Sequence, residues 1–234
     1  MAINNRTPIV TNGLVMYLDA GNRNSYISGS AMWRDVSLNN NNGTLVNGPT
    51  FSSDNGGSIV FDGIDDYALV PYSSNIPTGS SARSVSLWFY TNASTWNANI
   101  NNLFFYGTSG ISNAFGIDFD SYPQMEVYTW GGLGRDLLFN TTFSLVGWKN
   151  IMITYNGALT ILIYENGVYT QTLSLSGPTN TSISDVYIGA TNPSVLPGNY
   201  FTGSIAITQI YNRALSAIEV SQNYNAQKSR FNLI

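Results

Sequence analysis

Three acidic residues in the middle of the chain have a spacing that carbohydrate chemistry could use. Asp118 and Asp120 lie two residues apart in a segment of alternating apolar residues, and Glu126 follows them. Residues two apart on a β-strand point to the same side, so Asp118 and Asp120 would form a carboxylate pair on one face. Glycosidases cleave with such a pair. The same face could instead hold a sugar without cleaving it.

Several aromatic side chains are candidates for stacking on sugar rings. Trp96, Trp130, Tyr122 and Tyr128 lie in or near predicted loops, and Trp96 is set among asparagines. Exposed aromatic rings can stack on a sugar while Asn and Asp side chains bind its hydroxyls. The alternative is that these rings belong to the core or to an interface, as we expect for Trp33, Trp88 and Trp148. The candidate glycan-binding residues are Trp96, Trp130, Tyr128, Tyr122, Asp118 and Asp120.

A second acidic group lies in the segment 58–70, which is predicted to be a strand, a turn and a strand. Asp62, Asp65 and Asp66 crowd into this turn. Their oxygens could bind a structural calcium ion, with Asp19 or Asp35 contributed by nearby loops. The alternative is that the carboxylates accept hydrogen bonds from the amides of a tight turn. No cofactor is otherwise required.

The composition excludes several classes of function. The 234 residues contain no Cys and no His, so thiol chemistry and imidazole bases or ligands are absent. The net charge is −4 with only nine Lys and Arg, which argues against a nucleic-acid partner. No apolar run approaches the length of about 18 residues that a membrane span requires. The first residues also lack the apolar core of a signal peptide.

Alternating apolar residues predict a chain built mainly of β-strands. In the region 149–173 two Asn-Gly pairs separate three apolar runs, which is a strong signal for successive hairpins. A capping box at Ser216 and Glu219 predicts one short helix that ends near residue 226. Further strands are predicted at 13–19, 44–46, 59–61, 67–70, 84–90, 103–106, 114–119, 124–130, 186–188 and 204–211. This pattern predicts an all-β sandwich of two antiparallel sheets with one C-terminal helix.

The order of several motifs resembles the laminin-G-like (concanavalin A-like) family. They include Phe61-Asp-Gly-Ile-Asp-Asp-Tyr67, Val85-Ser-Leu-Trp88 and Tyr211-Asn-Arg-Ala-Leu-Ser216 followed by Glu219. The resemblance implies a jelly-roll domain over residues 12–226, between an N-terminal arm at 1–11 and a C-terminal tail at 227–234. It also implies a calcium site at a sheet edge. Relatives commonly have acidic residues where this chain has Ala206 and Ile207, which puts such a site in doubt.

The segments Leu18-Asp-Ala-Gly-Asn22 and Asn223-Tyr-Asn-Ala226 are similar to laminin-G-like domains in structural proteins of tailed bacteriophages. This similarity implies a non-enzymatic virion protein on the capsid or tail surface, made in the host cytoplasm without a signal peptide. Its partners would be other virion proteins, with weak attachment to host-surface glycans and a homo-oligomer left open. One alternative is a carbohydrate-binding adhesin module of a tail fibre or cell surface. Another is a glycoside hydrolase.

Overall fold

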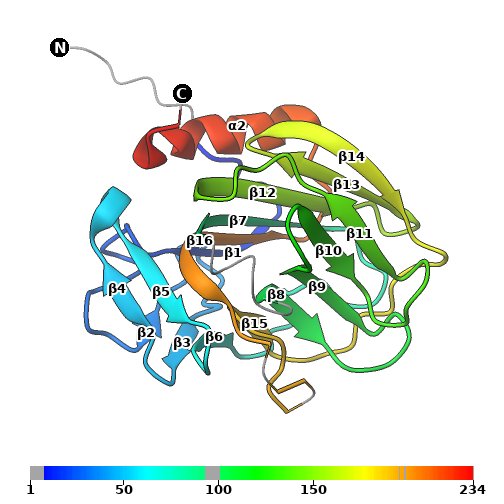
Figure 1. The fold of residues 1–234 in the computed structure, drawn as a ribbon, viewed down its shortest axis with the longest axis horizontal. Coiled ribbons are helices and arrows are strands. Elements are labelled where there is room, and N and C mark those ends of the chain that lie inside the picture. Colours follow the sequence, from blue (N-terminus) through cyan, green and yellow to red (C-terminus); the bar gives the residue numbers. More distant parts are fainter. Residues whose placement is uncertain (1–7, 93–100, 195, 198, 234) are drawn as a thin grey trace.

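Two antiparallel sheets of eight strands each pack face to face in this protein (Figure 1). The computed structural model describes residues 8–92, 101–194, 196–197 and 199–233. The predicted all-β sandwich with a short C-terminal helix is confirmed. In the described part of the chain, no helix has the length and apolar character needed to cross a membrane.

The first sheet has the strand order β14-β13-β12-β7-β16-β5-β4, with β1 paired along the second half of β16. The two Asn-Gly turns connect β12 to β13 and β13 to β14, as predicted. Its strands are β1 (Leu14–Asp19), β4 (Thr50–Ser52), β5 (Ser58–Asp62), β7 (Arg83–Thr91), β12 (Gly147–Tyr155), β13 (Thr160–Glu165), β14 (Val168–Ser174) and β16 (Thr202–Tyr211).

The second sheet has the order β11-β10-β9-β8-β15-β6-β3-β2. Two of its short strands, β2 and β11, and the equally short β4 of the first sheet were not predicted, because none of them has a clear alternation of apolar and polar residues. The strands are β2 (Met32–Trp33), β3 (Gly43–Val46), β6 (Tyr67–Val70), β8 (Asn101–Gly107), β9 (Ala114–Phe119), β10 (Gln124–Tyr128), β11 (Asp136–Asn140) and β15 (Val186–Ile188).

The main core lies between the two sheets and takes alternate residues from each strand. In β9 the buried core residues are Phe115, Ile117 and Phe119, and in β10 they are Met125 and Val127. Because side chains alternate along a strand, the residues between them must point to the other face of the second sheet. That second face therefore receives the acidic and aromatic residues of β9 and β10.

The helix α2 (Ala217–Gln227) packs on the outer face of the first sheet (Figure 1). It begins with the predicted capping box of Ser216 and Glu219. The 3₁₀ helix η2 (Lys228–Phe231) follows and stacks the Phe231 ring on that of Trp88, with ring centroids 4.2 Å apart. A second 3₁₀ helix, η1 (Asp54–Gly56), precedes β5. Trp33 and Trp88 are fully buried, whereas Trp148 is half-buried against Phe231.

Candidate ligand-binding site

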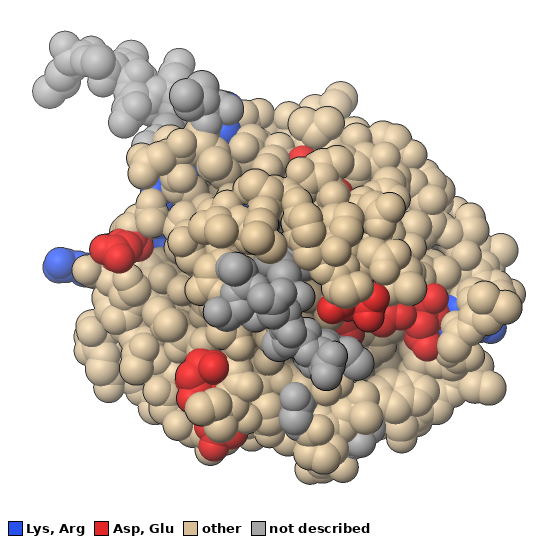
Figure 2. Space-filling model, viewed as in Figure 1, with Lys and Arg blue, Asp and Glu red and all other residues tan. Residues whose placement is uncertain are grey.

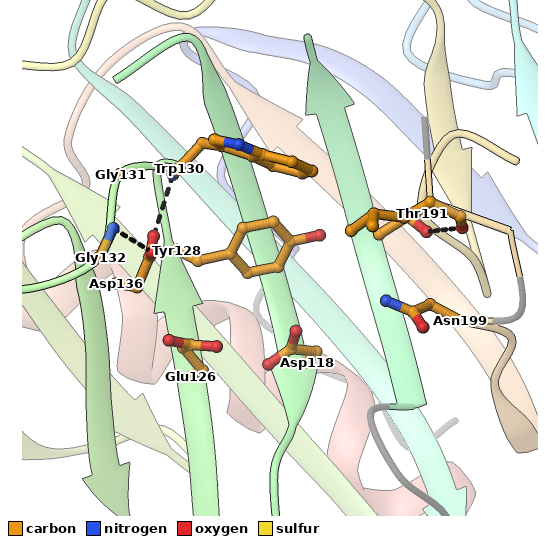
Figure 3. A pocket seen from close by; sticks show the side chains of 10 residues that line it. Asp118, Glu126, Tyr128, Trp130, Gly131, Gly132, Asp136, Thr191 and Asn199 are labelled. Atoms are coloured by element: carbon orange, nitrogen blue, oxygen red, sulfur yellow. Dashed lines mark hydrogen bonds between the residues drawn. The ribbon is translucent and has the colours of Figure 1, made fainter. Parts of the chain in front are cut away.

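A cavity of about 340 Å³ lies over strands β9, β10 and β11 on the face of the second sheet that points away from the core. Figure 2 shows a group of acidic side chains in a hollow on this side of the molecule. Thr191, Leu196 and Asn199 close the cavity on the side opposite to β11 (Figure 3). The lining residues are Asp118, Glu126, Tyr128, Trp130, Gly131, Gly132, Asp136, Thr191, Leu196 and Asn199.

Two carboxylates face each other at the base of this cavity. Asp118 in β9 and Glu126 in β10 are directly opposite in the strand register, which places their Cβ atoms about 5 Å apart. Asp118 is only 4% exposed, and its Oδ1 atom has no hydrogen-bond partner. The Oδ1 atom of Asn102, which is the neighbour of Asp118 on β8, is also buried without a partner. The base of the cavity is therefore rich in unused acceptors.

The crowding of these acids shifts their proton affinities. Burial, followed by the repulsion of Asp136 and Asp120, raises the pKa of Glu126 to about 7. Burial, followed by the repulsion of Glu126, Asp120 and Asp136, raises the pKa of Asp118 well above its usual range. A carboxyl group that is desolvated beside other acids holds its proton more tightly, because the charged form has no compensating partner.

Tyr128 forms the floor of the cavity beside these carboxylates. Its ring lies flat against the second sheet, stacked on Phe105 with ring centroids 5.8 Å apart, and its hydroxyl accepts a hydrogen bond of 2.7 Å from Nδ2 of Asn102. The position directly opposite Tyr128 on β9 is Gly116. A methyl group at this glycine would lie 2.1 Å from Cζ of Tyr128. The absence of a side chain at Gly116 is what lets the ring lie flat.

The substitution Gly116→Ala is expected to displace Tyr128 from the cavity floor. The new methyl group overlaps a ring that is 6% exposed and fixed by two contacts, so we expect a loss of about 1 kcal/mol in stability. The broken hydrogen bond between Asn102 and Tyr128 would appear as a shift of the Asn102 side-chain amide in NMR spectra. Gly43→Ala is the matched control, because Gly43 also lies in a strand, its φ is not in the left-handed region, and the nearest atom would lie 3.5 Å from a Cβ there. Unchanged Asn102 signals in Gly116→Ala would contradict this account of the floor.

Trp130 stands at the rim of the cavity in an unusual backbone conformation. Its φ angle is 69°, which non-glycine residues rarely adopt. Both oxygens of Asp136 hold this turn: Oδ1 accepts from the amide of Trp130 at 3.0 Å and Oδ2 from the amide of Gly132 at 2.6 Å. The indole is half-buried, and one edge contacts Phe105. Such strain costs about 1 kcal/mol or more and is frequent at binding sites.

The structure brings three of the predicted glycan-binding residues together and separates two. Asp118, Tyr128 and Trp130 line the cavity. Asp120 and Tyr122 lie next to it, in the turn between β9 and β10, and do not line it; Tyr122 is 48% exposed. Trp96 lies outside the described residues.

Other residues of the site were not predicted from the sequence. Asp136 follows a glycine-rich loop and begins the unpredicted strand β11. Asn102, Thr191 and Asn199 lie far from β10 in the chain, and only the strand register and the loop path bring them near it. Glu126 was noted as an acid that follows Asp120, without its pairing to Asp118. The sequence around each of these residues does not indicate which residues lie beside it in the fold.

The acidic turn between β5 and β6 is a separate feature. Carboxylate oxygens of Asp62, Asp65 and Asp66 lie within 4.8 Å of one another. Asp62 accepts a hydrogen bond of 2.8 Å from the amide of Ile64, and Asp66 accepts one of 3.2 Å from the amide of Asp62. These are the contacts expected of carboxylates that cap a tight turn.

The fourth predicted calcium ligand, Asp19, does not join this group. Asp19 lies opposite Ile207 on β16, whereas Asp62 lies opposite Thr202. Since a strand rises about 3.3 Å per residue, the two carboxylates are separated by about 16 Å along the sheet. Asp19 instead forms an ion pair with Arg230. Ala206 and Ile207 are buried under Phe231, so this part of β16 offers no ligand.

We expect calcium to leave the stability of the protein unchanged. The turn offers three carboxylates, two of which already bind amides, whereas calcium takes about six to eight oxygen ligands. The measurement is a thermal melt with 1 mM CaCl₂ and with excess EDTA. A midpoint that rises by more than about 5 °C with calcium would show a bound ion and would contradict the turn-capping role.

Sequence and structure comparisons identify proteins that share this fold. A family model described as the concanavalin A-like lectin/glucanases superfamily matches residues 61–221. A search of curated protein sequences gave no significant match. The binding domain of Paraclostridial Mosquitocidal Protein 1 has a TM-score of 0.70 at 18% identity, covering 92% of this chain and 52% of that one.

Two further solved structures are similar to this chain. Domain 4 of an extracellular arabinanase from Geobacillus stearothermophilus, in complex with arabinotriose, has a TM-score of 0.67 at 15% identity, with 90% of this chain and 98% of that chain covered. A Trypanosoma rangeli sialidase in complex with sialic acid has a TM-score of 0.68 at 18% identity, with 97% and 36% covered. This chain thus spans about half of the toxin domain and about a third of the sialidase.

Proposed function

Because this chain belongs to the concanavalin A-like lectin/glucanases superfamily, we propose that it binds a carbohydrate in the cavity over β9–β11. The observation that carries the proposal is the position of Trp130. A strained turn, held by Asp136, keeps this indole at the rim of a cavity whose base is formed by Asp118 and Glu126.

The lining offers the two kinds of contact that sugars need. Trp130 and Tyr128 supply aromatic surface, on which the apolar face of a sugar ring can pack. Asp118, Glu126 and Asn199 supply polar groups for hydroxyls. The cavity volume of about 340 Å³ lies at the lower end of the range of roughly 300–1,000 Å³ for small-molecule sites. This size suits one or two sugar residues.

The similar structures also support the proposal of carbohydrate binding. The arabinanase domain was solved with arabinotriose and the sialidase with sialic acid, and the toxin structure is a binding domain. At 15–18% identity these likenesses establish the shared fold. The ligand assignment for this chain rests on its own cavity.

We propose that binding occurs without hydrolysis. Glycosidases hold one carboxyl group protonated and the other ionised, so their two environments push the pKa values apart. In this cavity both Asp118 and Glu126 are raised by burial and by neighbouring acids. None of the described lining residues is a Lys or Arg that would keep one of them ionised. Release of reducing ends from a polysaccharide, abolished in Glu126→Gln, would contradict this proposal and favour a glycoside hydrolase.

The biological setting that we propose is the surface of a bacteriophage particle. This proposal is supported by the similarity of the segments 18–22 and 223–226 to phage structural proteins. A virion protein displayed on the capsid or tail would dock on other virion proteins and add weak attachment to host glycans. Mass spectrometry of purified particles tests the setting. Absence of the protein from particles would leave the adhesin of a cell surface as the better assignment.

The proposed binding is tested on a glycan array with the wild-type protein and Trp130→Ala. Loss of an aromatic platform typically removes a large share of the energy of such a contact, so we expect every wild-type signal to fall at least about tenfold in the variant. The matched control is Trp148→Ala, which removes the same side chain from the far side of the sandwich. The proposal fails if no glycan binds, or if Trp130→Ala binds as the wild type does.

A further inference from the structure

We propose that the cavity over β9–β11 selects an amino sugar, whose protonated amino group binds between Asp118 and Glu126. The inference rests on the proposed carbohydrate-binding function and names its ligand class. It is carried by the unpaired, buried carboxylate of Asp118 at the base of a cavity that aromatic residues flank (Figure 3).

Two hydrogen-bond acceptors at the base of the cavity lack donors, which a ligand would have to supply. Oδ1 of Asp118 and Oδ1 of Asn102 are both buried and without partners, and the two residues are neighbours across β8 and β9. Buried polar atoms that lack partners are rare in folded proteins and call for an explanation. An ammonium group brings three donors and no acceptor, which matches a base that has acceptors to spare.

The negative charge of the cavity also favours a cationic ligand. Asp118, Glu126 and Asp136 line it, and Asp120 lies close enough to repel Glu126. No Lys or Arg belongs to the described lining. Arg135 directly precedes Asp136 in the chain, and its guanidinium donates instead to the carbonyls of Gly177 and Pro178. Opposite charge in a desolvated site is strongly favoured over a neutral group.

A sugar fits the rest of the lining better than a lysine side chain of a protein does. Across the cavity from Asp118 lie the Asn199 amide and the Thr191 hydroxyl, which donates to the carbonyl of Leu196 at 3.0 Å and keeps only its acceptor lone pairs for a ligand (Figure 3). These polar groups suit the ring hydroxyls next to an amino group. A lysine has only methylenes behind its ammonium group and would leave them unused.

The protonation of the cavity carboxyl groups supplies a second signature. Glu126 is faced by Asp118 from β9, by Asp120 from the following turn, by Asp136 from β11 and by Tyr128 from its own strand. All four are neutral or anionic, so an incoming ammonium would be the first cation in this group. Binding should therefore ionise a carboxyl group and release protons into the buffer near pH 5.5, where the amine of the ligand is already protonated.

The test is isothermal titration calorimetry with three tetrasaccharides: glucosamine, N-acetylglucosamine and glucose oligomers with the same β-1,4 linkage. We expect the glucosamine oligomer to bind at least tenfold more tightly than the other two. Its affinity should follow a bell-shaped pH profile, falling at low pH as carboxylates gain protons and at high pH as the amine loses its proton. Titrations in buffers of different ionisation enthalpy should show proton release.

Two variants localise the effect. Asp118→Asn should bring the glucosamine oligomer to the affinity of its acetylated form, and Asp54→Asn, which removes an exposed acid elsewhere, should not change it. Equal binding of all three oligomers would overturn the inference and leave carbohydrate binding intact. Binding of a lysine-rich peptide in preference to the glucosamine oligomer would also overturn it. Failure of all three oligomers to bind would also overturn the inference, whereas the proposed function itself fails when no glycan on the array binds.

Discussion

Replacing Arg83 with alanine is expected to lower the free energy of unfolding by about 3–4 kcal/mol. Arg83 begins β7 and is fully buried at one end of the core. Its guanidinium donates to the carbonyls of Ser81 and Gly79 and to the hydroxyls of Thr181 and Tyr106. It also lies over the ring of Phe115 at 5.3 Å.

All four hydrogen-bond partners of Arg83 are uncharged. Arg83 therefore stabilises the fold by connecting separate segments through hydrogen bonds, not by forming an ion pair. The residues that it contacts come from the segment 79–81, from β8 and from the segment around 181. Alanine would leave these acceptors buried and would open a cavity the size of the lost side chain. Arg83→Met separates the two causes, because it keeps much of the volume and removes the donors.

The measurement is urea denaturation, extrapolated to water. The exposed Arg34 provides the matched control: Arg34→Ala should change stability by less than about 0.5 kcal/mol. If Arg83→Ala were as mild as this control, the hydrogen bonds of the guanidinium would have no structural role. If Arg83→Met were as stable as the wild type, packing alone would explain the loss.

The stability of the unliganded protein is expected to fall as pH rises from 5 to 8. The pKa of Glu126 is about 7 in the folded state against 4.5 in its ordinary state. The folded protein therefore holds a proton that the unfolded chain releases in this window, and its stability is full below about pH 4.5 and lost as pH rises through 7. After allowance for solvent screening, Glu126 contributes about 2 kcal/mol to this decline. Asp118 acts in the same direction.

The substitution Glu126→Gln should remove the contribution of Glu126 to this pH dependence, about 2 kcal/mol, and make the protein more stable at pH 8. Glu219→Gln is the matched control, because it makes the same substitution at a glutamate whose pKa is lowered and not raised. The ion pair with Arg213 holds the pKa of Glu219 at about 2, so its stabilising effect is lost at acid pH and should be constant between pH 5 and 8. A wild-type stability that is flat or rises over this range would show that the acids of the cavity are not crowded as described.

The fold was predictable because its signals are local. The alternation in 114–119 and 124–128, the two Asn-Gly turns and the capping box at Ser216 each act within a few residues. The strand β11 was missed because Asp136-Leu-Leu-Phe-Asn140 has two adjacent leucines and no period of two. As an edge strand it pairs with β10 alone, so its place depends on the neighbour more than on its own sequence.

The site was only partly predictable for a related reason. Asp118, Tyr128 and Trp130 stand out by residue type, since acidic residues are few in this chain and large aromatic rings can stack on sugars. Gly116 matters because the register places it opposite Tyr128, and Asp136 matters because its oxygens reach the amides of Trp130 and Gly132. These relations are set by pairing across strands, which a single sequence does not display.

The central claim is that the cavity over β9–β11 is a carbohydrate site, and NMR titration of the ¹⁵N-labelled protein tests it most directly. Oligosaccharides that the glycan array identifies would be added to the wild type and to Trp130→Ala. We predict that the shifted amide signals are those of residues 126–132, of Thr191, Leu196 and Asn199, and of the indole of Trp130, and that the variant shows none of these shifts. Shifts confined to another surface, or identical shifts in Trp130→Ala, would contradict the account.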